Sequence, residues 1–469
     1  MGGKVGSDDG PENGQRPRPS RLFEAFVVSA AGPGVAPVMM YCYAPAGADL
    51  MQYKVVPEFS FPESELKLPP QADDLGGSKE SRERETFAFV LTGGDGTRLH
   101  GYCRRYATAA GNEEVACILT QHSWYDVFSK ILDAFQETAC SEAGAPGVAS
   151  FARNLQHAGL PAPGRAMRVP MEGQRELEFV RPWNTSECRY DARLCELFRC
   201  LPVSKTVNRP GPRVPARARQ PRSRPLAAQV MLFFLMLTER RVILLSSKPS
   251  RLSNCAHALS SLLYPFAWQH IYVPILVPKM LDYVCAPMPF LIGMHIAMLP
   301  SLKNMPMEEV VMVDLDRGRL RYNEKDVAHL PDEHFDAMCN ALMTSLNAKT
   351  GDDRVDWAPL ANVFLDFFLS VFSTWRRFVA RRDGAALFDQ HAFRAAQRKS
   401  IVKFLAEFER SQVPAPPPAP PPAPLAHRRP RRRAPQMYEE MFRARTREAP
   451  GGGAREDDPF DLALALLVN

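Results

Sequence analysis

The stretch that decides the fold reads Leu-Leu-Tyr-Pro-Phe-Ala-Trp-Gln-His at residues 262–270, Ile-Tyr-Val-Pro-Ile-Leu-Val at 271–277, and Leu-Asp-Tyr-Val-Cys-Ala-Pro-Met-Pro-Phe-Leu-Ile-Gly-Met-His at 281–295. The middle piece is a continuous apolar run, which is typical of a buried strand. Prolines punctuate the connections on both sides, and proline is disfavoured inside helices and central strands. The stretch therefore predicts buried strands with rigid, proline-containing ends.

A β-α-β pattern surrounds this stretch. Residues 241–246 form a buried strand by their continuous Val-Ile-Leu-Leu, and a helix follows that we expect Ser253 to cap. Its inward-facing residues are Leu259, Leu262 and Leu263. Further strands are predicted at 289–294 and 310–315, the last of which ends at Asp316-Arg-Gly318. A central α/β unit is the expected result.

The first part of the chain predicts an antiparallel sheet. Residues 22–28 and 38–43 form two strands around Gly32-Pro-Gly34, which supplies turn geometry. Residues 85–92 and 99–102 form a hairpin, since apolar side chains alternate along the first strand and glycines follow it.

An apolar strand at 115–119 and an amphipathic helix complete this first unit. We expect Ser123 to cap the helix, with Asp126 in its first turn. The residues of its apolar face are Trp124, Val127, Phe128, Ile131, Leu132 and Phe135. Residues 144–164 are rich in proline and glycine and are expected to form a connector.

Helical periodicity dominates after Pro331. Phe335, Met338, Leu342 and Leu346 lie on one face of a first helix, and residues 363–379 and 393–408 predict two more. We therefore expect the third unit to be all helix.

The stretch at 262–295 resembles the core signature of the DENN domain, and Pro161-Ala-Pro-Gly164 and Glu239-Arg-Arg241 match further motifs of that family. Residues 281–295, together with Trp268-Gln-His270, resemble the connecdenn class. Gly101-Tyr-Cys-Arg-Arg105 resembles instead the neighbouring class that lacks a long C-terminal tail. Both classes stay open at this point.

The resemblance implies an α/β fold in three parts. A longin-like α+β upstream lobe is expected at 21–140 after a disordered start at 1–20, and a connector at 141–190. The α/β core lobe is expected at 191–325 and an all-helical downstream unit at 326–469. From its own strands and helix alone, a generic α+β domain is the alternative for the first lobe.

Two segments interrupt the predicted helices. Residues 207–229 and 413–436 consist mainly of Pro, Arg and Ala, which cannot build a core. Each begins with Val and ends with Gln, whose codons can supply the ends of an intron, so we interpret both as unspliced introns or silent loops. The alternative is that 418–424 is a polyproline ligand for an SH3-like domain, oriented by the arginines of 428–433.

The two segments also explain the net charge of +6. They hold six and five arginines and no acid, so the remainder of the chain is mildly acidic. A folded nucleic-acid surface is therefore not expected.

The chain has ten cysteines, and their spacing does not match a metal site. We interpret them as reduced core residues of a cytosolic protein, among them Cys42, Cys103, Cys117, Cys255 and Cys285. Neither a signal peptide nor a membrane span is predicted.

Sequence motifs for covalent chemistry are missing. Gly93-Gly-Asp-Gly96 lacks the spacing and lysine of a phosphate-binding loop, and no catalytic or metal motif occurs. His257, His270 and His295 lie on apolar segments, where a hydrogen-bonded structural role is more common than metal ligation. We predict no catalytic residue, metal or cofactor.

The resemblance implies a guanine-nucleotide exchange factor for a Rab-family small GTPase. We predict that five residues contact the GTPase, because they are polar or large and flank strand ends: Trp268, His270, Asp282, Pro287 and Met288. The alternative is that these residues serve only to pack the domain. A scaffold without exchange activity is the second hypothesis. Asp458-Pro-Phe460 resembles a clathrin-adaptor ligand. The expected location is cytoplasmic, peripheral on endosomal or clathrin-coated vesicle membranes.

Overall fold

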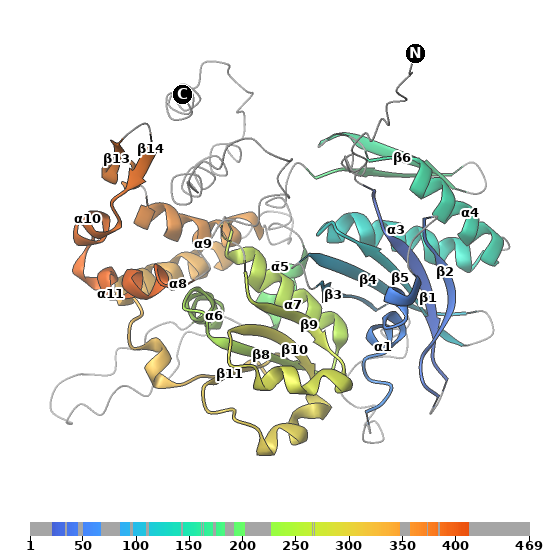
Figure 1. Cartoon of the computed structure of the whole chain (residues 1–469), viewed down its shortest axis with the longest axis horizontal. Coiled ribbons are helices and arrows are strands. Elements are labelled where there is room, and N and C mark those ends of the chain that lie inside the picture. Colours follow the sequence, from blue (N-terminus) through green and yellow to red (C-terminus); the bar gives the residue numbers. More distant parts are fainter. Residues whose placement is uncertain are drawn as a thin grey trace, which may run out of the picture.

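The computed structural model describes residues 21–32, 35–45, 50–66, 85–93, 97–108, 112–141, 144–160, 162, 164–171, 175–182, 192–201, 227–264, 266, 268–347, 357–372, 374–382 and 385–411. Two five-stranded sheets lie side by side, and a set of helices packs at the far side of the second sheet (Figure 1). The mixed α/β class predicted from the sequence is confirmed. The predicted domain boundaries remain predictions.

The first sheet is antiparallel, in the order β2-β1-β5-β4-β3. Its strands are β1 (Ala25–Ala30), β2 (Val38–Tyr43), β3 (Thr86–Thr92), β4 (Arg98–Ala107) and β5 (Glu113–Thr120). The predicted hairpin is confirmed, since β3 pairs with β4 along its length and Leu91 lies opposite Leu99. Alternate residues of each strand enter two different cores, as the period of two requires.

Helices cover both faces of this sheet. The helix α3 (Tyr125–Ala139) packs on one face, and the short η1 (Leu50–Tyr53) and α1 (Val56–Ser60) pack on the other. The expected cap at Ser123 is wrong, because the capping position of α3 is Trp124, which makes no side-chain cap. The helix is stabilised by the burial of Phe128, Ile131 and Leu132 and not by a side-chain cap at its start.

The expected connector at 144–164 contains a helix. α4 (Gly144–His157) packs on α3, and Phe151 lies 4.7 Å from Phe135 between ring centroids. A hairpin of β6 (Ala166–Pro170) and β7 (Glu176–Val180) follows. The apolar spacing of Val148, Phe151 and Leu155 outweighs the glycines and proline of the segment because all three become buried.

The second sheet is mostly parallel, in the order β12-β11-β8-β10-β9. Its strands are β8 (Arg241–Ser246), β9 (Ile271–Leu276), β10 (Phe290–His295), β11 (Val310–Asp314) and the antiparallel β12 (Arg319–Arg321). At Gly293 in β10, an added Cβ would lie 1.9 Å from the carbonyl oxygen of Pro274 in β9. Only glycine permits this close approach of the two strands.

Two layers enclose the parallel sheet. The helices α5 (Ala192–Cys200), α6 (Ala228–Leu237) and α7 (Pro249–Leu262) share one core with its first face. The 3-10 segments η4 (Pro278–Cys285) and η5 (Ile296–Asn304) pack on the opposite face. The predicted cap at Ser253 is wrong, since α7 begins at Pro249 and the Ser253 hydroxyl donates to the Ser250 carbonyl oxygen.

The third unit is not all helix. It contains η6 (Glu324–Val327), α8 (Asp332–Asn347), α9 (Trp357–Phe372), η7 (Trp375–Phe378), α10 (Gln390–Ala395) and α11 (Lys399–Phe408). Between η7 and α10, β13 (Val379–Arg382) and β14 (Ala385–Phe388) form a hairpin. The predicted helix at 363–379 therefore ends at Phe372.

The first Pro/Arg segment ends earlier than predicted. Gln229 is fully buried in α6, and its Nε2 donates to the carbonyl oxygen of Leu201. Ala227 is also buried. Residues 207–226 and the second segment, 413–436, lie outside the described residues, as do the start at 1–20 and Asp458-Pro-Phe460.

Within the described part of the chain, no helix has the length and apolar character to cross a membrane. The same residues hold no group of three or more His, Cys, Asp or Glu that could bind a metal ion. All nine described cysteines are free thiols. Cys103, Cys117 and Cys255 are buried as predicted. Cys285, at the end of η4, is exposed, and Cys42, on the edge strand β2, is half-buried.

Candidate functional site

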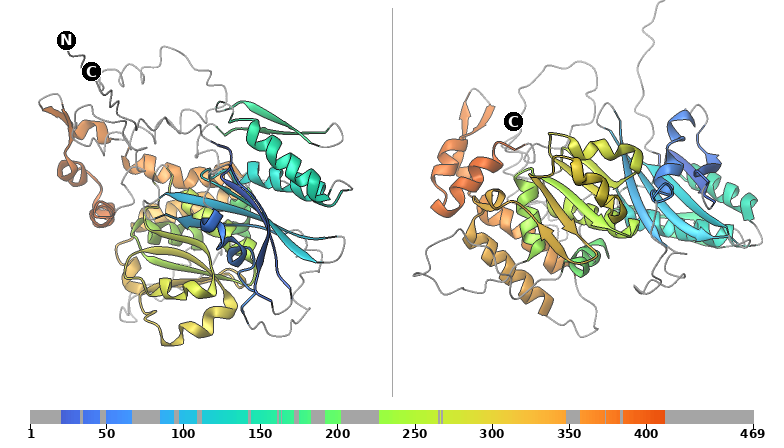
Figure 2. Two further views of the ribbon diagram at one scale, coloured as in Figure 1. Left: turned by 45° about the vertical axis from the view of Figure 1, so that its right-hand side comes forward. Right: turned by 90° about the horizontal axis from the view of Figure 1, so that it is seen from below.

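The two lobes meet where the edge strand β3 of the first sheet lies against the edge strand β9 of the second (Figure 2). Arg98 at the start of β4 bridges this seam. Its Nη2 donates to the carbonyl oxygens of Trp268, at 2.7 Å, and His270, at 3.5 Å. Its guanidinium also lies 5.4 Å from the centroid of the Tyr272 ring. Burial lowers the pKa of Arg98.

Two further contacts join the lobes. Glu85, before β3, accepts hydrogen bonds from the backbone N of Ser250 at 3.0 Å and from its hydroxyl at 2.6 Å. Lys279 in η4 lies 2.7 Å from Glu58 in α1, and this hydrogen bond raises the pKa of Lys279. Ile275 and Val277, at the end of β9, enter the core of the first lobe. The lobes therefore form one continuous body at this seam.

The structure places Trp268 in the interior, so the expectation that its side chain faces a partner is wrong. The residue is 1% exposed and its Nε1 donates to the carbonyl oxygen of Ile271 at 3.0 Å. His270 is nearly covered, and its Nε2 lies 2.8 Å from Oε1 of Glu239. Glu239 itself has φ 55°, a conformation that is uncommon outside glycine. These residues hold the loop before β9 in place.

The other three predicted residues, Asp282, Pro287 and Met288, are exposed on η4 and the segment that follows it. Met288 is 52% exposed, and Tyr283, which sequence reasoning missed, is 46% exposed. Phe290, two residues after Met288, is fully buried in β10. The same motif contains Tyr283, which follows the predicted Asp282 and precedes the buried Val284. A large side chain next to a predicted contact residue was therefore a signal in the sequence.

Methionine is concentrated around this surface. Seven of the 19 methionines lie between residues 280 and 312. Met294 of β10 and Met298 of η5 are buried in the core between the sheet and the 3-10 segments, and Met280, Met305, Met307 and Met312 pack against that core. The flexible thioether side chain adapts to neighbours of different shape. The exposed residues of η4 therefore lie over a methionine-rich core.

Residues of the first lobe extend the exposed set across the seam. Val55, 42% exposed, lies one helical turn before Glu58, which contacts Lys279. We define the interlobe surface as Val55, Glu58, Lys279, Asp282, Tyr283, Pro287 and Met288. It combines apolar side chains with charges of both signs, as protein-binding surfaces do.

Three partly buried histidines lie beside the seam. His100 and His122 of the first lobe and His257 of α7 all have lowered pKa values because burial disfavours their charged forms; that of His100 falls to about 4. His295 has the structural role predicted for it, since Ala297 N donates to its Nδ1 at 3.2 Å and its Nε2 lies 3.1 Å from the carbonyl oxygen of Ser247.

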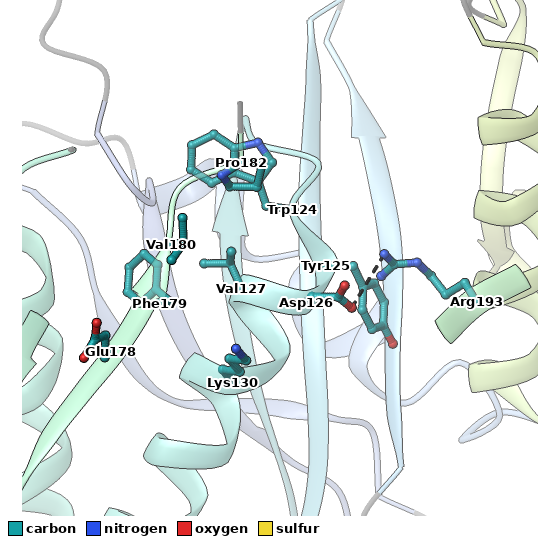
Figure 3. Close-up of a pocket in the computed structure, with 10 residues that line it drawn as sticks. All are labelled: Trp124, Tyr125, Asp126, Val127, Lys130, Glu178, Phe179, Val180, Pro182 and Arg193. Atoms are coloured by element: carbon teal, nitrogen blue, oxygen red, sulfur yellow. Dashed lines mark ion pairs between the residues drawn. The ribbon is translucent and has the colours of Figure 1, made fainter. Parts of the chain in front are cut away.

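A pocket of about 330 Å³ lies between the start of α3, β7 and α5 (Figure 3). The Arg193 guanidinium covers the Tyr125 ring at 4.0 Å and lies 3.9 Å from Asp126. Trp124 and Phe179 line its other side. The cation–π and ionic contacts of Arg193 join α5 to α3, so they form a fourth polar link between the two lobes.

Side-chain contacts join the two lobes, and an exposed surface of apolar and charged side chains lies at their junction. The DENN (AEX-3) domain profile matches residues 112–208 and 226–318, and the uDENN domain profile matches residues 37–106. Together they span more than half of the chain. The chain belongs to the DENN-domain family. The break at 209–225 falls inside the first Pro/Arg segment.

Relatives of known name support this membership. The chain is 32% identical to human DENN domain-containing protein 2B over 378 residues, and 33% identical to human DENN domain-containing protein 2A over 385 residues. Each match covers 77% of this chain, but only 30% and 34% of the relative. The chain thus spans about a third of these relatives. It is 27% identical to human DENN domain-containing protein 2D, of which the match covers 71%.

Proposed function

We propose that this protein is a guanine-nucleotide exchange factor that binds a Rab-family small GTPase and promotes GDP release for GTP loading in vesicle and endosomal trafficking. The family membership supports the GTPase as partner. The observation that carries the proposal is the interlobe surface, on which Asp282, Tyr283 and Met288 are exposed beside a seam held by Arg98 and Glu85.

Such a protein needs neither a catalytic acid nor a base. It must bind the nucleotide-free GTPase more tightly than the loaded form, and by linkage the same difference weakens the binding of nucleotide and Mg²⁺. A surface built from two joined lobes is suited to this task, because it can hold the GTPase switch segments away from the phosphates. GTP then enters as the more abundant nucleotide.

The decisive experiment screens purified Rab proteins loaded with a fluorescent GDP analogue. Catalytic amounts of the full chain should accelerate release from one or a few of them, and excess GTP should dissociate the complex. A scaffold of DENN type, which binds a GTPase or a clathrin adaptor without exchange, would bind the GTP-loaded form at least as well as the empty one. If no Rab releases its nucleotide faster and one Rab binds in its GTP-loaded form, the scaffold function is correct and the exchange function is rejected.

The remaining partners and the location are also proposals. Peripheral association with endosomal or clathrin-coated vesicle membranes follows from the proposed partner, which acts at membranes. An SH3-like domain for the residues 418–424 and an adaptor for Asp458-Pro-Phe460 rest on sequence alone. Pull-down with synthetic peptides of these two segments, each beside a scrambled control, tests them separately from nucleotide exchange.

A further inference from the structure

The free edge of the first sheet is unusual in its composition. The edges β3 and β9 face each other at the seam, so among the described residues β2 and β12 are the outer edges of the two large sheets. β12 is three residues long and carries Arg319 and Arg321, both exposed. Short length and charge are how edge strands commonly avoid pairing with other chains. β2 has six residues, Val-Met-Met-Tyr-Cys-Tyr, and no charge.

Exposed apolar side chains follow this edge. Met40 is 62% exposed, Val38 is 49% exposed, and Val35 just before the strand is 60% exposed. A bulge separates the pairing of Val28 with Tyr41 from that of Ser29 with Met39, so Met40 is the unpaired extra residue. Bulges turn a side chain out of the regular alternation. Here the bulge places Met40 at the mouth of a pocket.

The pocket beside β2 has a volume of about 650 Å³, within the range of ligand sites. Its apolar walls come from Phe26 and Val28 of β1, Tyr41 of β2, Phe135 of α3 and Val148 of α4. Phe26 and Phe135 stack with ring centroids 4.0 Å apart, which makes the floor rigid. At one end Tyr106 donates to Glu114 at 2.8 Å, so the pocket is apolar with an acidic end.

We propose that β2 and this pocket together bind an extended peptide segment of a partner protein. The segment would lie along the free edge of β2, insert one bulky apolar side chain into the pocket and place a neighbouring Lys or Arg at Glu114. The exposed Val35, Val38 and Met40 extend beyond the mouth, so the apolar surface is longer than a small molecule would need. The carboxylate at the acidic end favours a peptide that has a basic residue next to the inserted apolar one. Strand addition with side-chain pockets is an established mode of peptide recognition.

The test uses the full chain and a pool of short labelled peptides in which valine and threonine alternate around one variable residue followed by arginine. We expect members with a bulky apolar residue at the variable position to bind, as measured by fluorescence polarisation. Met40→Glu and Val38→Glu should weaken that binding by about tenfold or more. Val180→Glu, at an apolar position exposed to 54% on β7, should leave it unchanged.

Two exposed thiols of the same protein locate the binding. Cys140 lines the pocket, whereas Cys285 lies on η4 of the other lobe. Saturating peptide should slow alkylation of Cys140 about fivefold or more and leave Cys285 unaffected, measured by mass spectrometry. Binding of no peptide in the pool, or equal effects of Met40→Glu and Val180→Glu, overturns the proposal.

Three further outcomes also reject it. Protection of Cys140 by a fatty acid but by no peptide would assign the pocket to a small amphiphile. A dimer in sedimentation that Met40→Glu dissolves would assign the edge to a second copy of the chain. Loss of Rab exchange in Met40→Glu at unchanged melting temperature would assign the surface to the GTPase.

Discussion

Nη2 of Arg98 lies 2.7 Å from the carbonyl oxygen of Trp268, and this hydrogen bond joins a strand of the first sheet to the loop before β9 in the second. The two residues are 170 positions apart in the chain. A charged donor to a buried carbonyl is among the stronger hydrogen bonds of proteins. Together with the contacts of Glu85, Lys279 and Arg193, this hydrogen bond joins the lobes beside the interlobe surface.

Replacement of this arginine tests the seam. Arg98→Met retains the aliphatic chain but removes the donors to Trp268 and His270, so we expect the free energy of unfolding to fall by about 1.5–3 kcal/mol. Arg168→Met is the matched control, because its ion pair with Glu178 is exposed on a hairpin and should change stability by less than about 0.5 kcal/mol. Equal losses in urea denaturation would show that Arg98 does not hold the lobes.

Charged substitutions test the interlobe surface. Asp282→Lys and Met288→Glu alter exposed side chains, so we expect weaker binding of the nucleotide-free GTPase at an unchanged melting temperature. Phe290→Ala, by contrast, removes a fully buried ring and should lower stability by about 3–5 kcal/mol. Unchanged affinity in both surface variants, measured by biolayer interferometry, would place the GTPase elsewhere.

A single methyl group tests the packing of the parallel sheet. In Gly293→Ala, the new Cβ would collide with the backbone of Pro274, so we expect a loss of about 1–3 kcal/mol or more. Gly32→Ala is the control, since its Cβ would meet only Val35 at 3.6 Å, an ordinary contact. Thermal melts of the two variants should separate clearly. A Gly293→Ala variant as stable as the control would disprove the close strand approach.

Acid should weaken the folded state through His100. The pKa of His100 is lowered from 6.5 to about 4, chiefly by burial and then by Arg98 and His122, so the unfolded chain binds the proton first. The free energy of unfolding should therefore decrease as the pH falls from about 6.5 to about 4. Burial, and then the nearby Arg193, also lower the pKa of His257, so acid should reduce the free energy of unfolding through this residue as well. His100→Gln should show a smaller drop in melting temperature between about pH 7 and pH 5 than the parent; an identical drop would exclude His100.

The revised boundary of the first Pro/Arg segment is testable by deletion. Removal of 207–226 should leave stability nearly unchanged, because loop closure contributes only about 0.6 kcal/mol per doubling of length. Gln229→Ala should lower stability by about 1–3 kcal/mol, since it leaves the buried carbonyl of Leu201 without this donor. A deletion far less stable than the parent would show that residues of 207–226 are needed for folding.

Local patterns were sufficient for most strands and for the family motif. β8, β9, β10 and β11 follow from continuous apolar runs, and the β3–β4 hairpin follows from alternation and its glycines. The caps at Ser123 and Ser253 failed because a polar residue before an apolar helix does not show where tertiary burial begins. α4 was missed because proline and glycine obscured its three buried apolar residues.

The sequence by itself determined the buried strands and the family motif at 262–295, since each depends on neighbours along the chain. Only the tertiary structure decided that Trp268 is interior, that Arg98 fastens the lobes and that Met40 stands at a pocket. Those properties arise between residues far apart in sequence. A side chain's burial is set by what packs on it, and the period of its own strand does not contain that information.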